Sequence, residues 1–129
     1  MKKLIEKALQ AREFSYAPYS EFRVGAALET AKGEIITGCN IENGAYTPTN
    51  CAERTAIFKA VSEGKRDFVR IAIVGGKGEE MVAPAPCGVC LQVMMEFCAP
   101  ETFEIIMARS VEDYEVCTLS ELLPKGFKL

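Results

Sequence analysis

Hydrophobic periodicity divides the first third of the chain into one helix and two strands. Apolar residues recur at a helical spacing from about Lys3 to Phe14, and the proline-containing segment 15–20 breaks this pattern. Two extended runs, Phe22–Thr30 and Glu34–Cys39, flank a short turn that contains glycine. This arrangement predicts a helix followed by a β-hairpin.

The rest of the chain alternates between helices and strands. After a loop at 40–50, a helix is expected from Cys51 to Glu63, where Gly64 supplies the usual C-terminal glycine. The later elements are expected to be a buried strand at Val69–Val74, a glycine-rich turn, a helix at Cys87–Phe97, strands at Phe103–Ala108 and Glu115–Cys117, and a helical turn at Ser120–Leu123. Because helices separate these strands, parallel pairing through crossovers is expected. The sequence therefore predicts one α/β domain over residues 1–129, with three layers and a mixed five-stranded sheet that has helices on both faces.

Composition and charge argue against several classes of partner. The 129 residues include 15 basic and 18 acidic side chains, giving a net charge of −3, and no histidine. The basic residues are scattered, so no face that could neutralise nucleic-acid phosphates is predicted. No apolar run is long enough to cross a bilayer, and the first residues do not form a secretion signal. We therefore expect a cytoplasmic protein without nucleic-acid or membrane partners.

Three of the six cysteines stand in positions typical of metal ligands. Cys87 and Cys90 form a Pro-Cys-x-x-Cys motif, and Cys51 opens the second predicted helix two residues before Glu53. If neighbouring parallel strands precede both helices, the helix N-termini meet at the carboxyl ends of these strands and bring the thiols together. Three thiolates are typical of zinc, and a fourth position left open for water is typical of catalytic zinc. The other three cysteines are expected to be buried, unreactive thiols: Cys39, Cys98 and Cys117.

The pattern ligand-x-Glu followed by Pro-Cys-x-x-Cys is the signature of zinc deaminases. Zinc lowers the pKa of a bound water towards about 7. Glu53 is placed to take a proton from that water and to pass it to the substrate, a role that falls to a carboxyl group because the chain has no histidine. A structural zinc site completed by Cys39 or another cysteine stays open as an alternative.

At these motifs the sequence resembles the homotetrameric cytidine deaminase family, over almost the whole chain. The similar segments are Phe22–Ala27, Gly38–Asn43, Cys51–Ala56, Pro86–Cys90, and Glu121–Pro124 followed by Phe127. The resemblance implies hydrolysis of cytidine or deoxycytidine to uridine or deoxyuridine with release of ammonia. It also implies Zn²⁺ held by Cys51, Cys87 and Cys90, Glu53 as the proton shuttle, and assembly into a homotetramer.

The same resemblance implies a set of substrate contacts. Phe22 would stack on the base, and Ala52 would contact the base through its backbone. Asn40 and Glu42 would hold ribose hydroxyls, and a carboxylate at that point would repel a nucleotide phosphate, which favours free nucleosides. Two aromatic residues would close the pocket, that of a neighbouring subunit: Tyr46 and Phe127. From residue type alone, simpler roles stay open: packing for Phe22, a turn cap for Asn40 and a solvated position for Glu42.

Other positions bear on the charge of the metal site and on the substrate. Three thiolates leave Zn²⁺ with a net negative charge, which hydrogen bonds from Arg54 to a ligand sulfur would offset. A surface salt bridge is the simpler role for Arg54. Leu91 stands where many members of the family have arginine, which predicts less neutralised thiolates and slower turnover. The loop 44–50 also departs from the family pattern and motivates an alternative substrate, a modified or antibiotic aminopyrimidine nucleoside.

Two functions of other classes are compatible with parts of the sequence. A non-catalytic module stapled by zinc would need a fourth protein ligand and would not depend on Glu53. An editor of cytosine in RNA or DNA would need basic and aromatic residues interleaved on one face, and the acidic charge of the chain argues against this.

Overall fold

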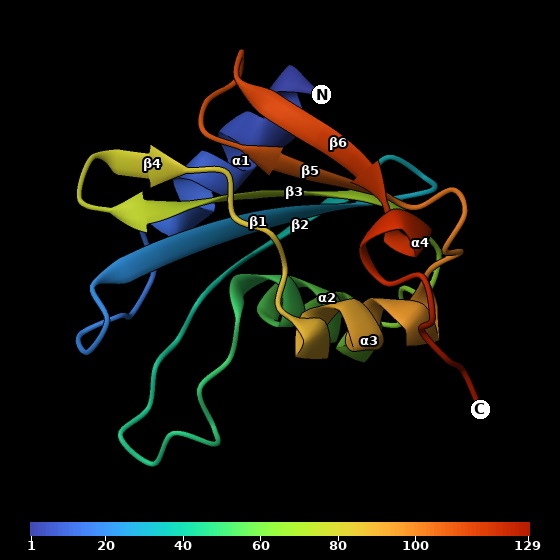
Figure 1. Ribbon diagram of the computed structural model, residues 1–129, viewed down its shortest axis with the longest axis horizontal. Helices are drawn as coiled ribbons and strands as arrows, with labels where there is room; N and C mark the ends of the chain where they lie inside the picture. The colour runs from blue at the N-terminus through green and yellow to red at the C-terminus, as the bar shows by residue number, and fades with distance from the viewer.

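A mixed sheet lies between helices on its two faces in the computed structural model, which describes residues 1–129 (Figure 1). The helices are α1 (Lys2–Arg12), α2 (Ala52–Ser62), α3 (Gly88–Phe97) and α4 (Leu119–Leu122). The strands are β1 (Phe22–Thr30), β2 (Ile35–Cys39), β3 (Phe68–Lys77), β4 (Glu80–Val82), β5 (Glu104–Ala108) and β6 (Tyr114–Thr118). None of the helices combines the length and the apolar character that crossing a membrane requires. The predicted three-layer α/β architecture is confirmed.

The strands follow the order β2-β1-β3-β5-β6, and the short β4 pairs with β3. Only β3 and β5 are parallel, whereas all other pairs are antiparallel. The expectation that neighbouring parallel strands precede both site helices is therefore wrong, because β1 lies between β2 and β3 in the sheet, and the antiparallel β4 follows β3 before α3 begins. Since β1 is antiparallel to both, β2 and β3 still run in one direction. Their carboxyl ends reach the same edge, where Cys39 is opposite Gly25 and Lys77 is opposite Phe22.

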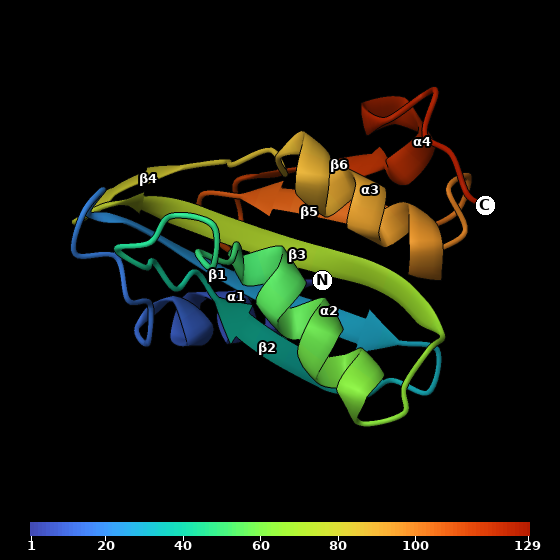
Figure 2. The same cartoon turned by 90° about the horizontal axis from the view of Figure 1, so that it is seen from below.

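Side chains that alternate along the strands build two separate cores. In β3, Ile71 and Ile73 join the larger cluster under α2, α3 and α4, whereas Ala72 and Val74 join the smaller cluster under α1. This alternation follows from the two-residue repeat of a strand. Figure 2 shows α2 and α3 side by side across one face of the sheet, with α1 on the other. The apolar runs seen in the sequence therefore belong to strands that are buried on both faces.

The glycine-rich turn predicted after residue 74 is wrong. Gly75 and Gly76 continue β3 and pair with β4, and the chain reverses at Gly78, whose φ is +56°. A Cβ on Gly76 would lie 2.1 Å from the carbonyl oxygen of Glu80. Glycine is needed there because the two backbones approach closely, not because the chain turns. The hairpin adds a sixth, short strand to the five that were predicted.

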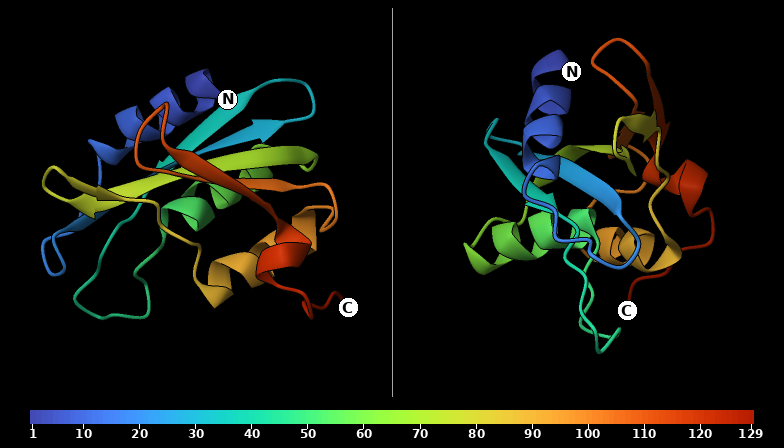
Figure 3. Two further views of the ribbon diagram at one scale, coloured as in Figure 1. Left: turned by 45° about the horizontal axis from the view of Figure 1, so that its top comes forward. Right: turned by 90° about the vertical axis from the view of Figure 1, so that its left-hand side faces the viewer.

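A close contact between β2 and α2 fixes the start of the second helix. A Cβ on Gly38 would lie 2.5 Å from the backbone nitrogen of Ala56 and 2.6 Å from the carbonyl oxygen of Ala52. The first turns of α2 therefore rest directly on the strand backbone. The preceding segment, 40–50, projects from the body of the molecule beyond α2 (Figure 3).

Candidate active site

Three thiols from two helix N-termini meet at one edge of the sheet. Cys51 is the N-cap of α2 and Cys87 is the N-cap of α3, so both precede the first helical turn that was predicted to contain them. The Cys87 sulfur accepts a hydrogen bond from the backbone N–H of Cys90 at 3.4 Å. The sulfur of Cys87 lies 3.9 Å from that of Cys51 and 3.5 Å from that of Cys90. Two elements far apart in the sequence thus place three soft ligand atoms together.

The spacing of these thiols fits tetrahedral zinc. With Zn–S bonds of about 2.3 Å, ligand sulfurs lie about 3.8 Å apart, and all three sulfurs here lie within 4.8 Å of one another. No fourth cysteine, aspartate or glutamate joins the group. The alternative of a structural site completed by Cys39 is therefore not supported. Three protein ligands leave one tetrahedral position for water, as in catalytic zinc sites.

Arg54 contacts the thiols, as predicted for a residue that offsets their charge. Its Nη2 donates a hydrogen bond to the Cys51 sulfur at 3.1 Å, and it forms no ion pair with a carboxylate. Hydrogen bonding from Cys90, together with Arg54, lowers the pKa of the Cys51 thiol. Leu91 is buried in the larger core, and no second cation contacts the thiols.

Glu53 lies in the first turn of α2 with only 5% of its surface exposed. Burial raises the pKa of its carboxyl to about 7, with a smaller contribution from the negative charge of Cys51. A carboxyl with a pKa near neutrality can both accept and donate a proton, as a general acid–base residue must. The sequence placed Glu53 beside the thiols, and the structure adds the burial that tunes it.

A pocket of about 290 Å³ opens beside Cys51, Glu53 and Cys87. Four of the predicted substrate residues line it: Phe22, Asn40, Glu42 and Ala52. Sequence reasoning missed the other residues of its wall: Val24, Thr49, Asn50, Ile73, Pro84 and Ala85. Their positions beside the motifs could have indicated most of them, because Thr49 and Asn50 precede Cys51, and Pro84 and Ala85 precede the Pro-Cys-x-x-Cys motif. The volume of this pocket is close to the lower limit for small-molecule sites.

Asn40 and Glu42 are held by hydrogen bonds to the chain as well as facing the pocket. The Asn40 side chain donates to the carbonyl of Phe22 at 2.7 Å and accepts from the N–H of Val24 at 2.9 Å. The Glu42 carboxylate accepts from the backbone N–H groups of Tyr19 and Ser20 at 2.9 and 3.2 Å. Asn40 therefore bonds to strand β1 rather than capping a turn, and Glu42 is hydrogen-bonded to the chain rather than only solvated. These bonds hold both side chains at the pocket.

Tyr46 and Phe127 lie outside this pocket. Tyr46 is 82% exposed on the projecting loop and has a positive φ of 65°, and Phe127 is 63% exposed. The carbonyl of Phe127 accepts a hydrogen bond from Gln92 at 2.8 Å. Neither aromatic ring closes the pocket of its own chain.

The remaining three cysteines are separate from the cluster. Cys98 is buried as predicted, whereas Cys39 and Cys117 are partly exposed. The prediction of burial is wrong for these two because Cys39 ends β2 and Cys117 lies on the edge strand β6.

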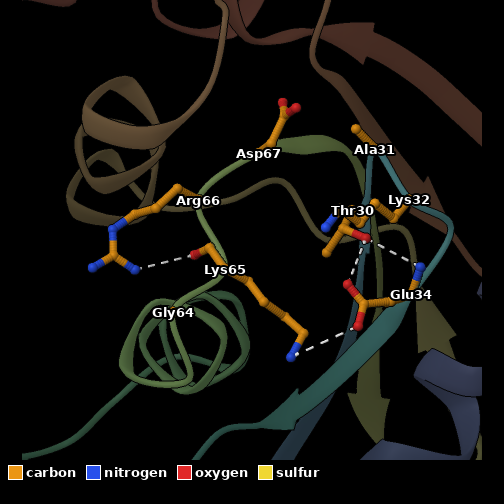
Figure 4. Close-up of a pocket in the computed structure, with 8 residues that line it drawn as sticks. All are labelled: Thr30, Ala31, Lys32, Glu34, Gly64, Lys65, Arg66 and Asp67. Carbon is orange, nitrogen blue, oxygen red and sulfur yellow. Dashed lines mark hydrogen bonds and ion pairs between the residues drawn. The ribbon is translucent and has the colours of Figure 1, made fainter.

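A second hollow, of about 210 Å³, lies at the opposite end of β1 (Figure 4). Charged and polar groups dominate its lining: Thr30, Ala31, Lys32, Glu34, Gly64, Lys65, Arg66 and Asp67. Lys65 forms ion pairs with Glu34 at 3.8 Å and with Glu63 at 3.7 Å. This hollow contains no thiol and no predicted site residue, so the chemistry belongs to the pocket beside the cysteines.

Comparison with known proteins assigns this geometry to a family. Residues 1–106 match the family model described as "Cytidine and deoxycytidylate deaminase zinc-binding region". The chain belongs to the cytidine and deoxycytidylate deaminase family. The cofactor of this deaminase is Zn²⁺, consistent with the spacing of Cys51, Cys87 and Cys90.

Relatives within the deaminase family cover nearly the whole chain. A cytidine deaminase of Halalkalibacterium halodurans is 51% identical over 96% of this chain and 91% of its own length. The crystal structure of a cytidine deaminase from Burkholderia pseudomallei has a TM-score of 0.88 and 47% identity, covering 97% of both chains. A blasticidin-S deaminase of Bacillus cereus is 33% identical over 94% of this chain and 87% of its own length. A deaminase of an antibiotic nucleoside is thus also among the relatives, at a lower identity than the cytidine deaminases above.

Proposed function

We propose that this protein is a cytidine deaminase, a zinc aminohydrolase that converts cytidine or deoxycytidine and water to uridine or deoxyuridine and ammonia. One observation carries the proposal: a buried carboxyl, Glu53, lies beside three thiols at zinc spacing and lines a pocket of about 290 Å³. The identity of 51% to a cytidine deaminase over almost the full length supports the same substrate.

Zinc held by Cys51, Cys87 and Cys90 would lower the pKa of a coordinated water towards about 7 and so supply a nucleophile at neutral pH. Glu53 handles the protons of the reaction. Its carboxylate accepts one proton from the attacking water and passes it to the ring nitrogen. It then accepts the proton of the hydroxyl group added to the ring carbon and passes it to the amino group, which leaves as ammonia while the carbonyl of the product forms. The raised pKa of about 7 keeps both protonation states accessible. The shielding of Glu53 from solvent directs these protons to the substrate.

The pocket walls suit a neutral nucleoside. Phe22 and Ile73 offer apolar surface for the flat base, and the backbone of Ala52 lies at the same wall. Asn40 and Glu42 offer an amide and a carboxylate for sugar hydroxyls. The carboxylate disfavours a 5′-phosphate, which supports nucleosides over nucleotides.

We also propose assembly into a homotetramer. Phe58 of α2 and Val89 of α3 are exposed apolar residues that flank a groove of about 540 Å³ between these helices. The aromatic rings of Tyr46 and Phe127 stand free of their own pocket, which supports contacts with a neighbouring copy. A cytoplasmic location stays a prediction from the sequence.

The test joins metal analysis to an ultraviolet assay of cytidine conversion. We expect one zinc per chain, and we expect Glu53→Gln to lower kcat by about 10²–10⁴-fold while zinc content is unchanged. The matched control is Glu6→Gln, an exposed carboxylate on α1, which should retain full activity. Full activity in Glu53→Gln, or in zinc-free protein, would contradict the proposal. Faster turnover of blasticidin S than of cytidine and deoxycytidine would favour the antibiotic substrate instead.

A further inference from the structure

The segment between α1 and β1 donates three hydrogen bonds to the carboxylate of Glu42. Both backbone N–H groups, those of Tyr19 and Ser20, point to Oε1 of the carboxylate. The hydroxyl of Ser20 donates to the other oxygen, Oε2, and its own oxygen accepts the N–H of Phe22 at 3.0 Å. One serine hydroxyl thus connects Glu42 to the backbone of Phe22, the proposed base-stacking residue.

The same segment grips Asn40 through a second serine. The Ser15 hydroxyl donates to Oδ1 of Asn40, which also accepts the N–H of Val24 at 2.9 Å. The Asn40 Nδ2 donates one hydrogen to the carbonyl of Phe22 at 2.7 Å. These bonds fix which end of the amide is oxygen and which is nitrogen, because Oδ1 faces two donors and Nδ2 faces an acceptor.

Counting hydrogen-bonding capacity shows what remains for a ligand. Oδ1 of Asn40 has both lone pairs occupied, and Nδ2 retains one free N–H. Oε1 of Glu42 is likewise filled by two N–H groups, whereas Oε2 retains one lone pair beside the Ser20 hydroxyl. Both residues line the pocket, and one free donor beside one free acceptor matches a single hydroxyl group that accepts one hydrogen bond and donates another.

We propose that Ser15 and Ser20 are positioning residues that orient Asn40 and Glu42 so that this pair reads one sugar hydroxyl of the substrate. The inference rests on the proposed nucleoside substrate and extends it to two residues that do not line the pocket. Ser20 holds the orientation of Glu42, since it is the one donor to Oε2. The Ser20 hydroxyl, with smaller contributions from the backbone N–H groups of Ser20 and Tyr19, also lowers the pKa of Glu42, which keeps the carboxylate an acceptor.

The test measures nucleoside binding in the Glu53→Gln background, where the substrate stays intact. Dissociation constants for cytidine, 2′-deoxycytidine and 3′-deoxycytidine are determined by calorimetry, with and without Ser20→Ala or Ser15→Ala. We expect each serine variant to weaken cytidine binding about tenfold. On the deoxynucleoside that lacks the hydroxyl read by the pair, the same variant should bind as tightly as its parent, because the interaction is already absent.

Two further variants separate positioning from general damage to the fold. Ser20→Thr keeps the hydroxyl at an exposed position and should restore binding. Ser110→Ala is the matched control, because the Ser110 hydroxyl also accepts backbone N–H groups, those of Glu112 and Asp113, and Ser110 neither lines the pocket nor bonds to a residue that does. It should leave all three affinities unchanged.

The outcomes distinguish this inference from the proposed function. Unchanged cytidine binding in both serine variants, or an equal loss for all three nucleosides, would overturn the positioning role even if the wild type deaminates cytidine. Selective loss in a protein that fails to deaminate would support the positioning role and contradict the enzyme activity. If none of the three nucleosides binds, both proposals are wrong.

Discussion

At the scale of single residues, burial decides the chemistry of Cys98. This residue is 8% exposed at the end of α3, and burial raises the pKa of its thiol to about 12 from an ordinary value of 9.0. Between these two values the unfolded chain loses a proton that the folded chain keeps. Stability is therefore fully present below pH 9 and falls as pH rises towards 12, by up to about 1.4 kcal/mol per pH unit.

Replacing Cys98 should flatten this alkaline loss. We expect the free energy of unfolding of the wild type to fall by about 2 kcal/mol more between pH 8 and pH 10.5 than that of Cys98→Ala. Urea denaturation at the two pH values measures the difference, and comparing the slopes cancels the cavity left by alanine. Parallel pH dependence in the two proteins would show that the thiol does not contribute.

Single residues of the site could be predicted where the chemistry is local. The Cys-x-Glu and Pro-Cys-x-x-Cys spacings place ligands and proton shuttle within a turn of a helix start, so Cys51, Glu53 and the cysteine pair were found. Ser15 and Ser20 could not be found in this way. Their partners lie 25 and 22 positions along the chain, and only the folded sheet brings them together.

At the scale of elements, periodicity predicted all four helices and five of the six strands, but it ended β3 at Val74 instead of Lys77 and missed β4. Gly75 and Gly76 suggested a turn because glycine is usually a sign of one. In the structure both glycines lie in strand β3, where neighbouring atoms leave no room for a side chain. A Cβ built on Gly75 would lie 3.1 Å from the ring of Phe22. Composition alone does not distinguish a glycine that frees the backbone from a glycine that makes room.

Gly38 lies against α2, the helix that carries Glu53, and a substitution there tests whether a glycine is needed to make room for a close approach. An added Cβ would press on the backbone of α2 at Ala52 and Ala56, and backbone cannot move aside as a flexible side chain can. We expect Gly38→Ala to destabilise the protein by about 3 kcal/mol and to lower kcat, because α2 is displaced from β2. Thermal unfolding and the cytidine assay measure the two effects.

The control for this substitution is Gly88→Ala, judged on stability alone. Gly88 lies in the first turn of α3, and an added Cβ there meets nothing within 4 Å. Its melting temperature should equal or exceed that of the wild type. A Gly38→Ala protein as stable as Gly88→Ala would mean that α2 does not rest tightly on β2.

At the scale of the whole molecule, the two faces of the sheet are unequal. One face is covered by α1 alone, over a small core of eight residues, and the other by α2, α3 and α4 over a core of eighteen. The site stands at the N-terminal ends of α2 and α3 (Figure 2), and the apolar groove runs between the outer surfaces of the same helices. Contacts between copies at this groove would therefore involve α2 and α3, the two helices whose N-termini carry the zinc-binding cysteines. The sequence implied such assembly only through its family resemblance. Phe58 and Val89 are apolar positions in helices, and the sequence pattern does not tell whether such positions face a core or another subunit.

A charge placed in the groove should separate the copies. Phe58 is 46% exposed on α2 and lines the groove, so Phe58→Glu would bury a carboxylate at the interface, at a cost that exceeds the gain from nearby apolar contacts. We expect light scattering to give a mass of four chains for the wild type and a smaller mass for this variant. Phe14→Glu, at an exposed aromatic residue that follows α1, should stay tetrameric.

If Tyr46 and Phe127 complete a neighbour's pocket, the dissociated variant should keep its zinc and yet lose at least about tenfold in activity. A monomeric wild type with full activity would contradict the assembly, and the exposed rings would then have no role in the site.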